Sequence, residues 1–351
     1  EDWRTGTMSA VAGGVTIVVD QPNTVPPITT PGILRARIRE AERDAICGFA
    51  VNAGVMPGAD LEGMWDAGAM AFGEIFAAPS SYSEGLDPET LRRSFARIHA
   101  LGGLATVHAE EVSDPAPGTL TGHDSARSGA GEARAVRAVS ALAPEGMRLH
   151  FCHMSAAASI EAARGTVEVT PHHLFLSHDM FEEDDTRARM NPPLRDEQTR
   201  HGLWSCWDRI DVIASDHAPH TSGEKDLPFQ AAPSGVPGVE TMMPLLMAAA
   251  RKRRITLVSV MEKTSWRPAA ILGIPRAGFE PGDRADFALY PGEITRIDAS
   301  HLHSRCGWSP FEGLAAIFPE EVVIRGRRAY SCGEYYEPQP AWYPGQGFLS
   351  P

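Results

Sequence analysis

Residues 15–24 read VTIVVDQPNT, a run of apolar and β-branched residues that ends in an aspartate and a turn. The run Val15–Asp20 predicts a buried strand, and residues 21–24 predict the turn after it. Residues 32–44 then predict a helix with charged residues on one side. This strand, turn and helix unit decides the fold class, because the same order recurs along the chain.

Further strands are predicted at 49–55, 71–76, 104–107, 148–152, 167–169 and 212–214, and helices at 61–67, 86–101 and 131–143. Such alternation predicts a parallel sheet, and the number of strands favours a TIM-type (β/α)₈ barrel over an open sheet. Seven strands leave this barrel one short, and the sequence begins at Glu1 in polar, helix-like residues. We therefore expect that the first barrel strand lies ahead of residue 1 and is missing from this sequence.

The pattern changes after about Gly278. Residues 285–290 predict a strand, and 321–324 with 327–330 predict a hairpin around Arg325-Gly326. We expect a metal-dependent barrel hydrolase domain over 1–277 and a small β-rich side domain over 278–337. The Pro- and Gly-rich residues 338–351 then predict an irregular C-terminal arm.

Composition excludes several classes of function. Lys and Arg number 32 against 45 Asp and Glu, and the net charge of −13 argues against binding a nucleic-acid backbone. No apolar run approaches the roughly 20 residues that span a bilayer, and no signal peptide is evident. The five cysteines form no CxxC pair, which predicts reduced thiols and a cytoplasmic protein.

Titratable residues stand at the predicted strand ends. His108 follows one strand in ATVHAEE, His153 follows another in LHFCHMS, and Asp216 follows a third in IASDHAPH. Glu74 lies in AFGEIFAA. In a barrel such positions line one mouth, where imidazole and carboxylate groups can converge on Zn²⁺. Asp216 could then take a proton from an attacking water and deliver it to a leaving nitrogen.

Each of these residues also has a structural interpretation. Taken alone, either histidine would be interpreted as a polar side chain with its hydrogen bonds satisfied. Asp216 alone would be interpreted as a helix cap, and Glu74 alone as a solvated or salt-bridged carboxylate. Their occurrence together favours the metal site. The pair His301 and His303 lies far downstream in a polar loop, and we interpret it as structural. The pair His172-His173 could line the site, but we interpret it as a local packing and hydrogen-bonding element.

The sequence resembles the cyclic amidohydrolases, the group of dihydroorotases, hydantoinases and allantoinases. Seven stretches, which span nearly the whole chain, occur in the order that is typical of the group. They are AGGVTIVVDQPNT (12–24), ATVHAEE (105–111), FCHMS (151–155), RMNPPLR (189–195), IASDHAPHTSGEK (213–225), PSGVPGVETMMPLL (233–246) and SPFEG (309–313).

This resemblance implies a binuclear zinc site in which His108 and His153 hold one metal, and Asp216 contacts the other and acts as general acid and base. Glu74 stands where many members carry a carboxylated lysine that bridges the metals. The glutamate side chain is shorter than a carboxylated lysine. Because a shorter bridge changes the spacing of the two metals, a single Zn²⁺ is the alternative to two. The group's HxH pair and the following arginine belong to the first barrel strand, which we expect ahead of Glu1.

The resemblance to dihydroorotases rests on His220, the fourth residue after Asp216. It implies reversible hydrolysis of dihydroorotate to N-carbamoyl-L-aspartate in pyrimidine biosynthesis, by a homodimer. Asn23 and His220 are expected at the substrate carboxylate, with Asn191 and the backbone of Gly235 and Gly238 at the ring amide. The alternatives are a hydantoinase- or allantoinase-like cyclic amidase and a non-catalytic scaffold.

Overall fold

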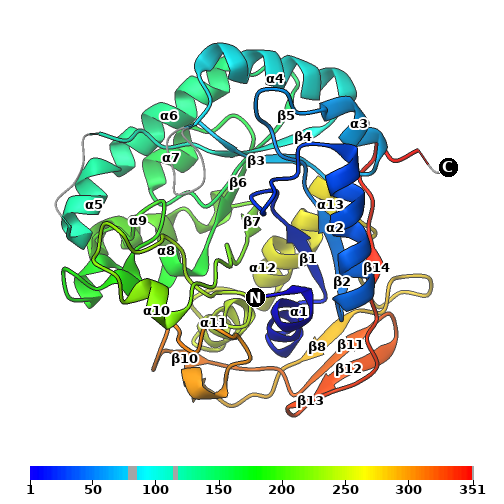
Figure 1. Ribbon diagram of the computed structural model, residues 1–351. Helices are drawn as coiled ribbons and strands as arrows, with labels where there is room; N and C mark the ends of the chain where they lie inside the picture. The colour runs from blue at the N-terminus through cyan, green and yellow to red at the C-terminus, as the bar shows by residue number, and fades with distance from the viewer. Residues whose placement is uncertain (78–84, 114–117, 350–351) are drawn as a thin grey trace.

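Seven parallel strands follow one another in chain order in the computed structural model, which describes residues 1–77, 85–113 and 118–349 (Figure 1). One sheet has the order β3-β4-β5-β6-β7, β1 pairs with β2, and a bridge between Ala53 and Phe72 joins the two groups. The predicted parallel α/β arrangement is confirmed. The strands are β1 (Ile17–Asp20), β2 (Gly48–Val51), β3 (Phe72–Phe76), β4 (Leu104–His108), β5 (Arg148–Phe151), β6 (Thr166–Val169) and β7 (Val212–Ile213).

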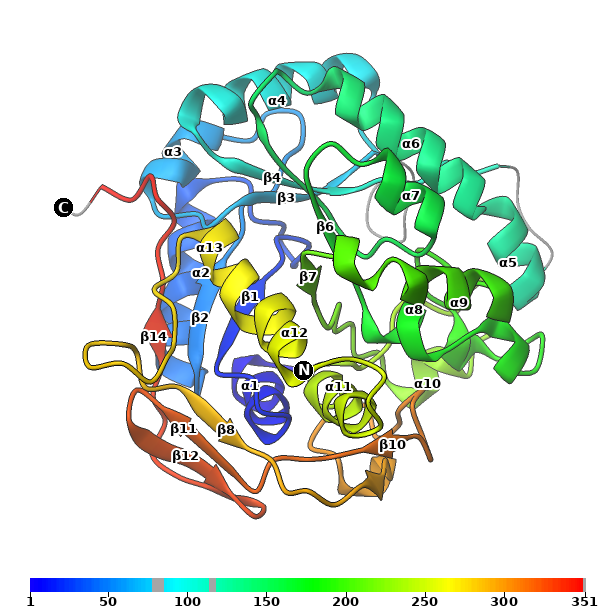
Figure 2. The same cartoon turned by 180° about the vertical axis from the view of Figure 1, so that it is seen from behind.

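Helices separate the strands and cover their outer side (Figures 1 and 2). Between β1 and β7 the larger helices are α2 (Pro31–Asp44), α3 (Leu61–Asp66), α4 (Pro88–Leu101), α5 (Leu120–Ala126), α6 (Gly129–Leu142), α7 (Ala157–Ala162), α8 (Pro171–Phe175) and α9 (Glu197–Ser205). The helix α1 (Trp3–Ala12) precedes β1, and α10 (Ser222–Lys225), α11 (Met242–Arg251), α12 (Leu257–Met261) and α13 (Arg267–Leu272) follow β7.

Helix α4 illustrates how local sequence sets these elements. The Asp87 side chain accepts hydrogen bonds from the amides of Glu89 and Thr90, which caps the first turn. Gly102, with φ of 73°, ends the helix in the left-handed conformation that glycine adopts without strain. Its buried residues recur at helical spacing, so one face packs on the core: Leu91, Phe95 and Ile98.

The ring of strands is open on one side. Within the described residues β7 and β1 share no hydrogen-bonded pairing, so the seven strands do not close into a barrel, as their number predicts. Among the described residues, β1 and β7 therefore each have one edge without a hydrogen-bonded partner strand. Residues of β1, β7 and α12 line one cavity at this opening.

The C-terminal segment adds a four-stranded antiparallel sheet of order β13-β12-β11-β8, which lies beside α1 (Figure 2). Its strands are β8 (Phe287–Leu289), β11 (Glu321–Ile324), β12 (Arg327–Ser331) and β13 (Glu334–Tyr335). Arg325 and Gly326 both have positive φ, 52° and 76°, as a tight two-residue hairpin turn requires. The predicted hairpin is therefore confirmed. A further pair, β9 (Thr295–Arg296) and β10 (Ala315–Ala316), is antiparallel.

The last segment contributes a strand that the sequence did not predict. In the arm expected at 338–351, of which the last two residues lie outside the described ones, β14 (Ala341–Trp342) pairs in parallel with β2. The pairing fixes this part of the arm against the edge of β2. Among the described helices, none is both long and apolar enough to cross a membrane.

Candidate active site

Three side chains that could bind a metal converge from three neighbouring strands. Glu74 is on β3, His108 is the last residue of β4, and His153 comes two residues after β5. Glu74 Oε1 lies 2.5 Å from His153 Nε2 and 3.1 Å from His108 Nδ1, and the two ring nitrogens are 3.1 Å apart. Both histidine side chains are buried. The three residues thus form one of the groups that could hold a metal ion.

Glu110 fixes the orientation of the His108 ring. Its Oε2 lies 2.7 Å from His108 Nε2, and it is also 2.5 Å from Nη1 of Arg127. This leaves Nδ1 of His108 facing Glu74 and His153. A carboxylate behind a ligating histidine is the usual way in which proteins set the tautomer and direction of the ring.

Asp216 joins this group from the end of β7. Its Oδ2 lies 3.7 Å from Nε2 of His172, which is buried and has no hydrogen-bond partner for either ring nitrogen among the described residues. Both His153 and Asp216 have positive φ, 37° and 45°. Such backbone strain in residues other than glycine is typical of functional sites, where the surrounding fold holds the side chain in place.

Burial and neighbouring charge shift the pKa values of this cluster in opposite directions. Burial, with the charges of Glu74 and Glu168, raises the pKa of Asp216 to about 6, although His153 opposes the shift. Burial alone would raise the pKa of Glu74, but the two adjacent imidazoles hold it well below its ordinary range. Burial lowers the pKa of His172 to about 3, so this ring is neutral near pH 7. A neutral His172 leaves Asp216 without a cationic partner on that side.

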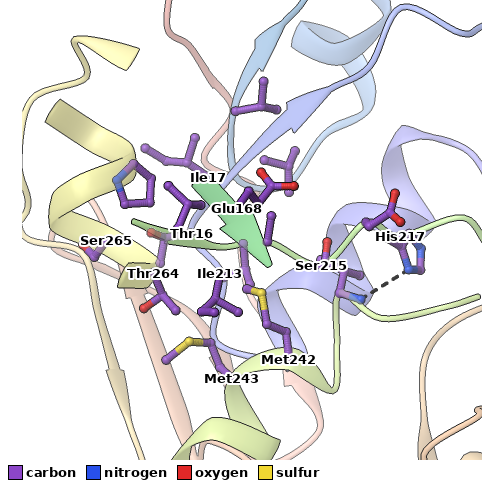
Figure 3. Close-up of a pocket in the computed structure, with 18 of the residues that line it drawn as sticks. Thr16, Ile17, Glu168, Ile213, Ser215, His217, Met242, Met243, Thr264 and Ser265 are labelled. Atoms are coloured by element: carbon purple, nitrogen blue, oxygen red, sulfur yellow. Dashed lines mark hydrogen bonds between the residues drawn. The ribbon is translucent and has the colours of Figure 1, made fainter. Parts of the chain in front are cut away.

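The group opens into a cavity of about 1150 Å³. Figure 3 shows Glu168, Ile213, Ser215 and His217 around it. Most of the residues that the sequence predicted for metal or substrate binding line the same cavity: Asn23, Glu74, His108, His153, Asn191, Asp216, His220 and Gly235. The fold therefore brings these residues to one cavity, which is large enough to admit a small molecule.

The predicted substrate-binding residues already make local hydrogen bonds. Asn191 Oδ1 accepts from His123 Nε2 at 2.9 Å, and His220 Nε2 donates to the carbonyl of Ser234 at 3.1 Å. Gly235 has φ of 131°, where a Cβ atom would lie 2.6 Å from the Cβ of Ala218. The fifth of these residues, Gly238, uses its amide to donate to His217 Nδ1 at 3.0 Å.

The paired histidines outside the site have structural partners. His303 Nδ1 lies 2.7 Å from Glu240 Oε1, and His301 is exposed beside Asp298. His173 contacts Thr170 and the carbonyl of Pro192. Sequence reasoning missed Glu110, and for His172 it favoured a packing role over a place in the site. The glutamate two residues after His108 was a usable signal, whereas the contact of His172 with Asp216 depends on the folded chain.

Known dihydroorotases are similar to this chain along most of its length. The dihydroorotase of Methanosarcina acetivorans is 40% identical over an alignment of 356 positions, which covers 93% of this chain and 76% of that protein. The dihydroorotase of Halobacterium salinarum is also 40% identical, over 93% of this chain and 80% of that protein. An allantoinase of Streptomyces avermitilis is 32% identical over 97% of this chain and 82% of that protein.

Among solved structures, the L-hydantoinase (dihydropyrimidinase) from Arthrobacter aurescens is similar, with a TM-score of 0.89 and 25% identity. The match covers 97% of this chain and 83% of that one. No protein-family model matches the sequence. On the identity and coverage shared with the archaeal proteins, the chain belongs to the dihydroorotase family.

Proposed function

We propose that this protein is a zinc-dependent dihydroorotase, which hydrolyses the ring amide of dihydroorotate to N-carbamoyl-L-aspartate and closes the ring in the reverse direction. The observation that carries the proposal is the convergence of Glu74, His108 and His153, with Asp216, on one cavity in a chain that is 40% identical to known dihydroorotases. The donor set and the cavity are those that a metal-dependent amide hydrolase needs.

The residues present fit a zinc ion. Two imidazole nitrogens and a carboxylate oxygen, all buried or nearly so, face one another with no cationic side chain between them in the described part of the chain. Neutral imidazole and carboxylate are preferred zinc ligands. Glu74, His108 and His153 would hold the ion, with Asp216 beside it. When bound, zinc supplies positive charge that polarises the amide carbonyl and lowers the pKa of a water at the site.

Asp216 serves as the general acid and base. Its carboxylate takes a proton from the attacking water and gives that proton to the ring nitrogen as the C–N bond breaks. A pKa raised to about 6 suits both tasks near neutral pH, because the group gains and loses a proton easily there. His172, 3.7 Å away, limits the positions that this carboxylate can occupy.

The cavity also offers polar groups for the substrate. Four of them line the cavity, and we assign Asn23 and His220 to the substrate carboxylate and Asn191 with the backbone of Gly235 to the ring amide. We assign Gly238 a supporting role at the edge of the cavity, since its amide donates a hydrogen bond to His217, which lines the cavity. Convergent polar groups of this kind distinguish a specific ligand pocket from an apolar cleft.

The fold of the hydantoinase neighbour supports a further part of the proposal. We infer that β1 to β7 are seven strands of a (β/α)₈ barrel whose remaining strand lies between β7 and β1. The facing free edges of these two strands support this arrangement, because unpaired strand edges are normally covered in native proteins.

The test is dihydroorotate hydrolysis by the full-length protein, before and after treatment with a zinc chelator. Turnover that is lost with the metal and restored by Zn²⁺ supports the proposal. Zinc-loaded protein that leaves dihydroorotate intact contradicts it. Allantoin and hydantoins belong in the same assay, since the allantoinase relative makes an allantoinase activity the second candidate.

A further inference from the structure

A second group of ligating side chains lies in the same cavity, closer to the amino end of β5. His150 and Cys152 are on or next to β5, and Glu168 is on β6. One nitrogen, one sulfur and one carboxylate oxygen of the three residues lie within 4.8 Å of one another. None of the three is assigned as a metal ligand, a proton carrier or a substrate contact in the hydrolysis proposed above. The group has the composition of a metal site and is separate from Glu74, His108 and His153.

Strand geometry explains why these three side chains meet. His150 and Cys152 are two residues apart, so they face the same side of β5, and Glu168 faces that side from the neighbouring strand. All three line the cavity, and Figure 3 shows Glu168 pointing into it. The alternate residues are buried in the hydrophobic core on the other side: Leu149, Phe151, Val167 and Val169.

The His150 ring is oriented as a metal-binding histidine. Its Nδ1 lies 2.8 Å from Thr166 Oγ1, and this hydroxyl donates to the carbonyl of Leu149 at 3.4 Å. The hydroxyl therefore accepts from Nδ1–H, which makes Nε2 the acceptor nitrogen of the neutral ring. Nε2 faces Glu168 Oε2 at 3.2 Å, so two acceptors oppose each other unless a cation or a proton lies between them.

Glu168 has few ways to neutralise its charge. In the described part of the chain, His150 is its one ion-pair partner, and no lysine or arginine contacts it. Its other oxygen, Oε1, accepts a hydrogen bond from the His153 amide at 3.3 Å.

We propose that His150 Nε2, Cys152 Sγ and Glu168 Oε2 form a second metal site, which binds one thiophilic divalent cation such as Zn²⁺ or Cd²⁺. On binding, the Cys152 thiol releases its proton to water and the thiolate bonds to the cation, with no change in oxidation state. Zinc–ligand bonds of about 2.0 to 2.3 Å are consistent with three ligating atoms this close together. A sulfur ligand distinguishes the site from the sulfur-free group of Glu74, His108 and His153.

A cation bound at this second site should also disturb the first site. A cation bound by Glu168 competes with the hydrogen bond that the His153 amide donates to this carboxylate. His153 is a ligand in the proposed hydrolase, so excess cation should lower dihydroorotate turnover. This consequence, unlike the binding site itself, rests on the proposed function.

Cadmium binding tests the site through its absorption. The thiolate-to-Cd²⁺ charge-transfer band reports only sulfur ligands, so the first site is silent. The full-length protein, cleared of metal with a chelator and then given one Zn²⁺ per chain, would carry Cys206→Ser and Cys332→Ser, which remove the two thiols that are not buried. Titrations would compare this protein with added Cys152→Ser, His150→Gln or Glu168→Gln. Cys306→Ser is the matched control, because Cys306 is another buried free thiol.

The expected result is a band that saturates at one Cd²⁺ per chain, persists in Cys306→Ser and disappears in Cys152→Ser. Glu168→Gln and His150→Gln should each weaken Cd²⁺ binding by about tenfold or more, since loss of a ligand costs at least as much as loss of its supporting partner. A band that survives in Cys152→Ser, or no band in the parent protein, overturns the proposal.

Two controls keep these outcomes clear. If Cys152→Ser does not fold by circular dichroism, the other two variants retain the thiol and decide the matter, and unchanged Cd²⁺ affinity in both overturns the site. Dihydroorotate turnover is measured on the same samples. A saturable cysteine-dependent band in a protein without turnover would retain the second metal site and contradict the proposed function.

Discussion

Glu110 Oε2 lies 2.7 Å from Nε2 of His108, on the opposite side of the ring from the nitrogen that faces Glu74. The carboxylate is buried and is also bonded to Arg127. Burial opposes its ionisation, but hydrogen bonding and charge from His108 hold the pKa of Glu110 at about 2. Glu110 is therefore an anion at any pH where the enzyme works, and it sets which nitrogen His108 offers to a metal.

Glu110→Gln should reduce zinc affinity and kcat/KM by about 10-fold to 100-fold, the usual effect of removing the carboxylate behind a ligating histidine. Zinc content after dialysis and steady-state kinetics measure the two effects. Glu111→Gln is the matched control, because its side chain is half exposed and pairs with Arg134 at the surface. Equal losses in both variants would contradict a specific role for Glu110.

Asp216→Asn should lower kcat by about 100-fold to 10,000-fold and leave the zinc content unchanged, because the amide cannot carry the proton. Asparagine tolerates the φ of 45° at this position, so the fold should persist. Kinetics with dihydroorotate and metal analysis on one preparation check both parts. A turnover rate near that of the unsubstituted protein would remove Asp216 from its assigned role.

The sequence predicted the strand and helix order well, because β-branched runs such as Val15–Asp20 and capped helices such as 88–101 carry local signals. It also placed His108 and His153 at or just after strand ends, whereas Glu74, predicted at such an end, lies in the middle of β3. The contacts of Glu168 and His172 could not be predicted, because they depend on which strands are neighbours and on the positive φ of His153 and Asp216. The two-residue strand β14 is too short to have a pattern of its own.

Arg195→Met should lower the free energy of unfolding by about 3 to 5 kcal/mol, the cost of breaking a buried ion pair. The buried guanidinium contacts Asp124 and lies 3.0 Å from Oε2 of Glu132 and 2.9 Å from Oγ of Ser155. Ser155 follows His153 by two residues, so turnover should fall as well. Urea denaturation measures the first effect.

Arg134→Met provides the comparison for Arg195→Met, since Arg134 pairs with Glu111 in an exposed position. Its expected cost is below about 1 kcal/mol. Similar losses of stability in the two variants would contradict the importance assigned to the buried network around Arg195.

Lys225 should make stability depend on pH. Its buried Nζ donates to the carbonyls of Arg189 and Pro233 at 3.0 and 2.8 Å, and no carboxylate pairs with it among the described residues. Burial lowers its pKa from 10.5 to about 7. Between these two values the unfolded chain binds a proton that the folded chain does not, so this lysine makes the free energy of unfolding rise with pH.

Replacing Lys225 with methionine removes that dependence. The stability of the unsubstituted protein relative to Lys225→Met should therefore be greater at pH 9 than at pH 7, and urea denaturation of both proteins at each pH measures the difference. The comparison cancels groups that titrate equally in the two proteins. A relative stability that is constant or falls between pH 7 and 9 would mean that Lys225 remains protonated in the folded protein, held by its two carbonyl partners and the nearby ring of Trp308.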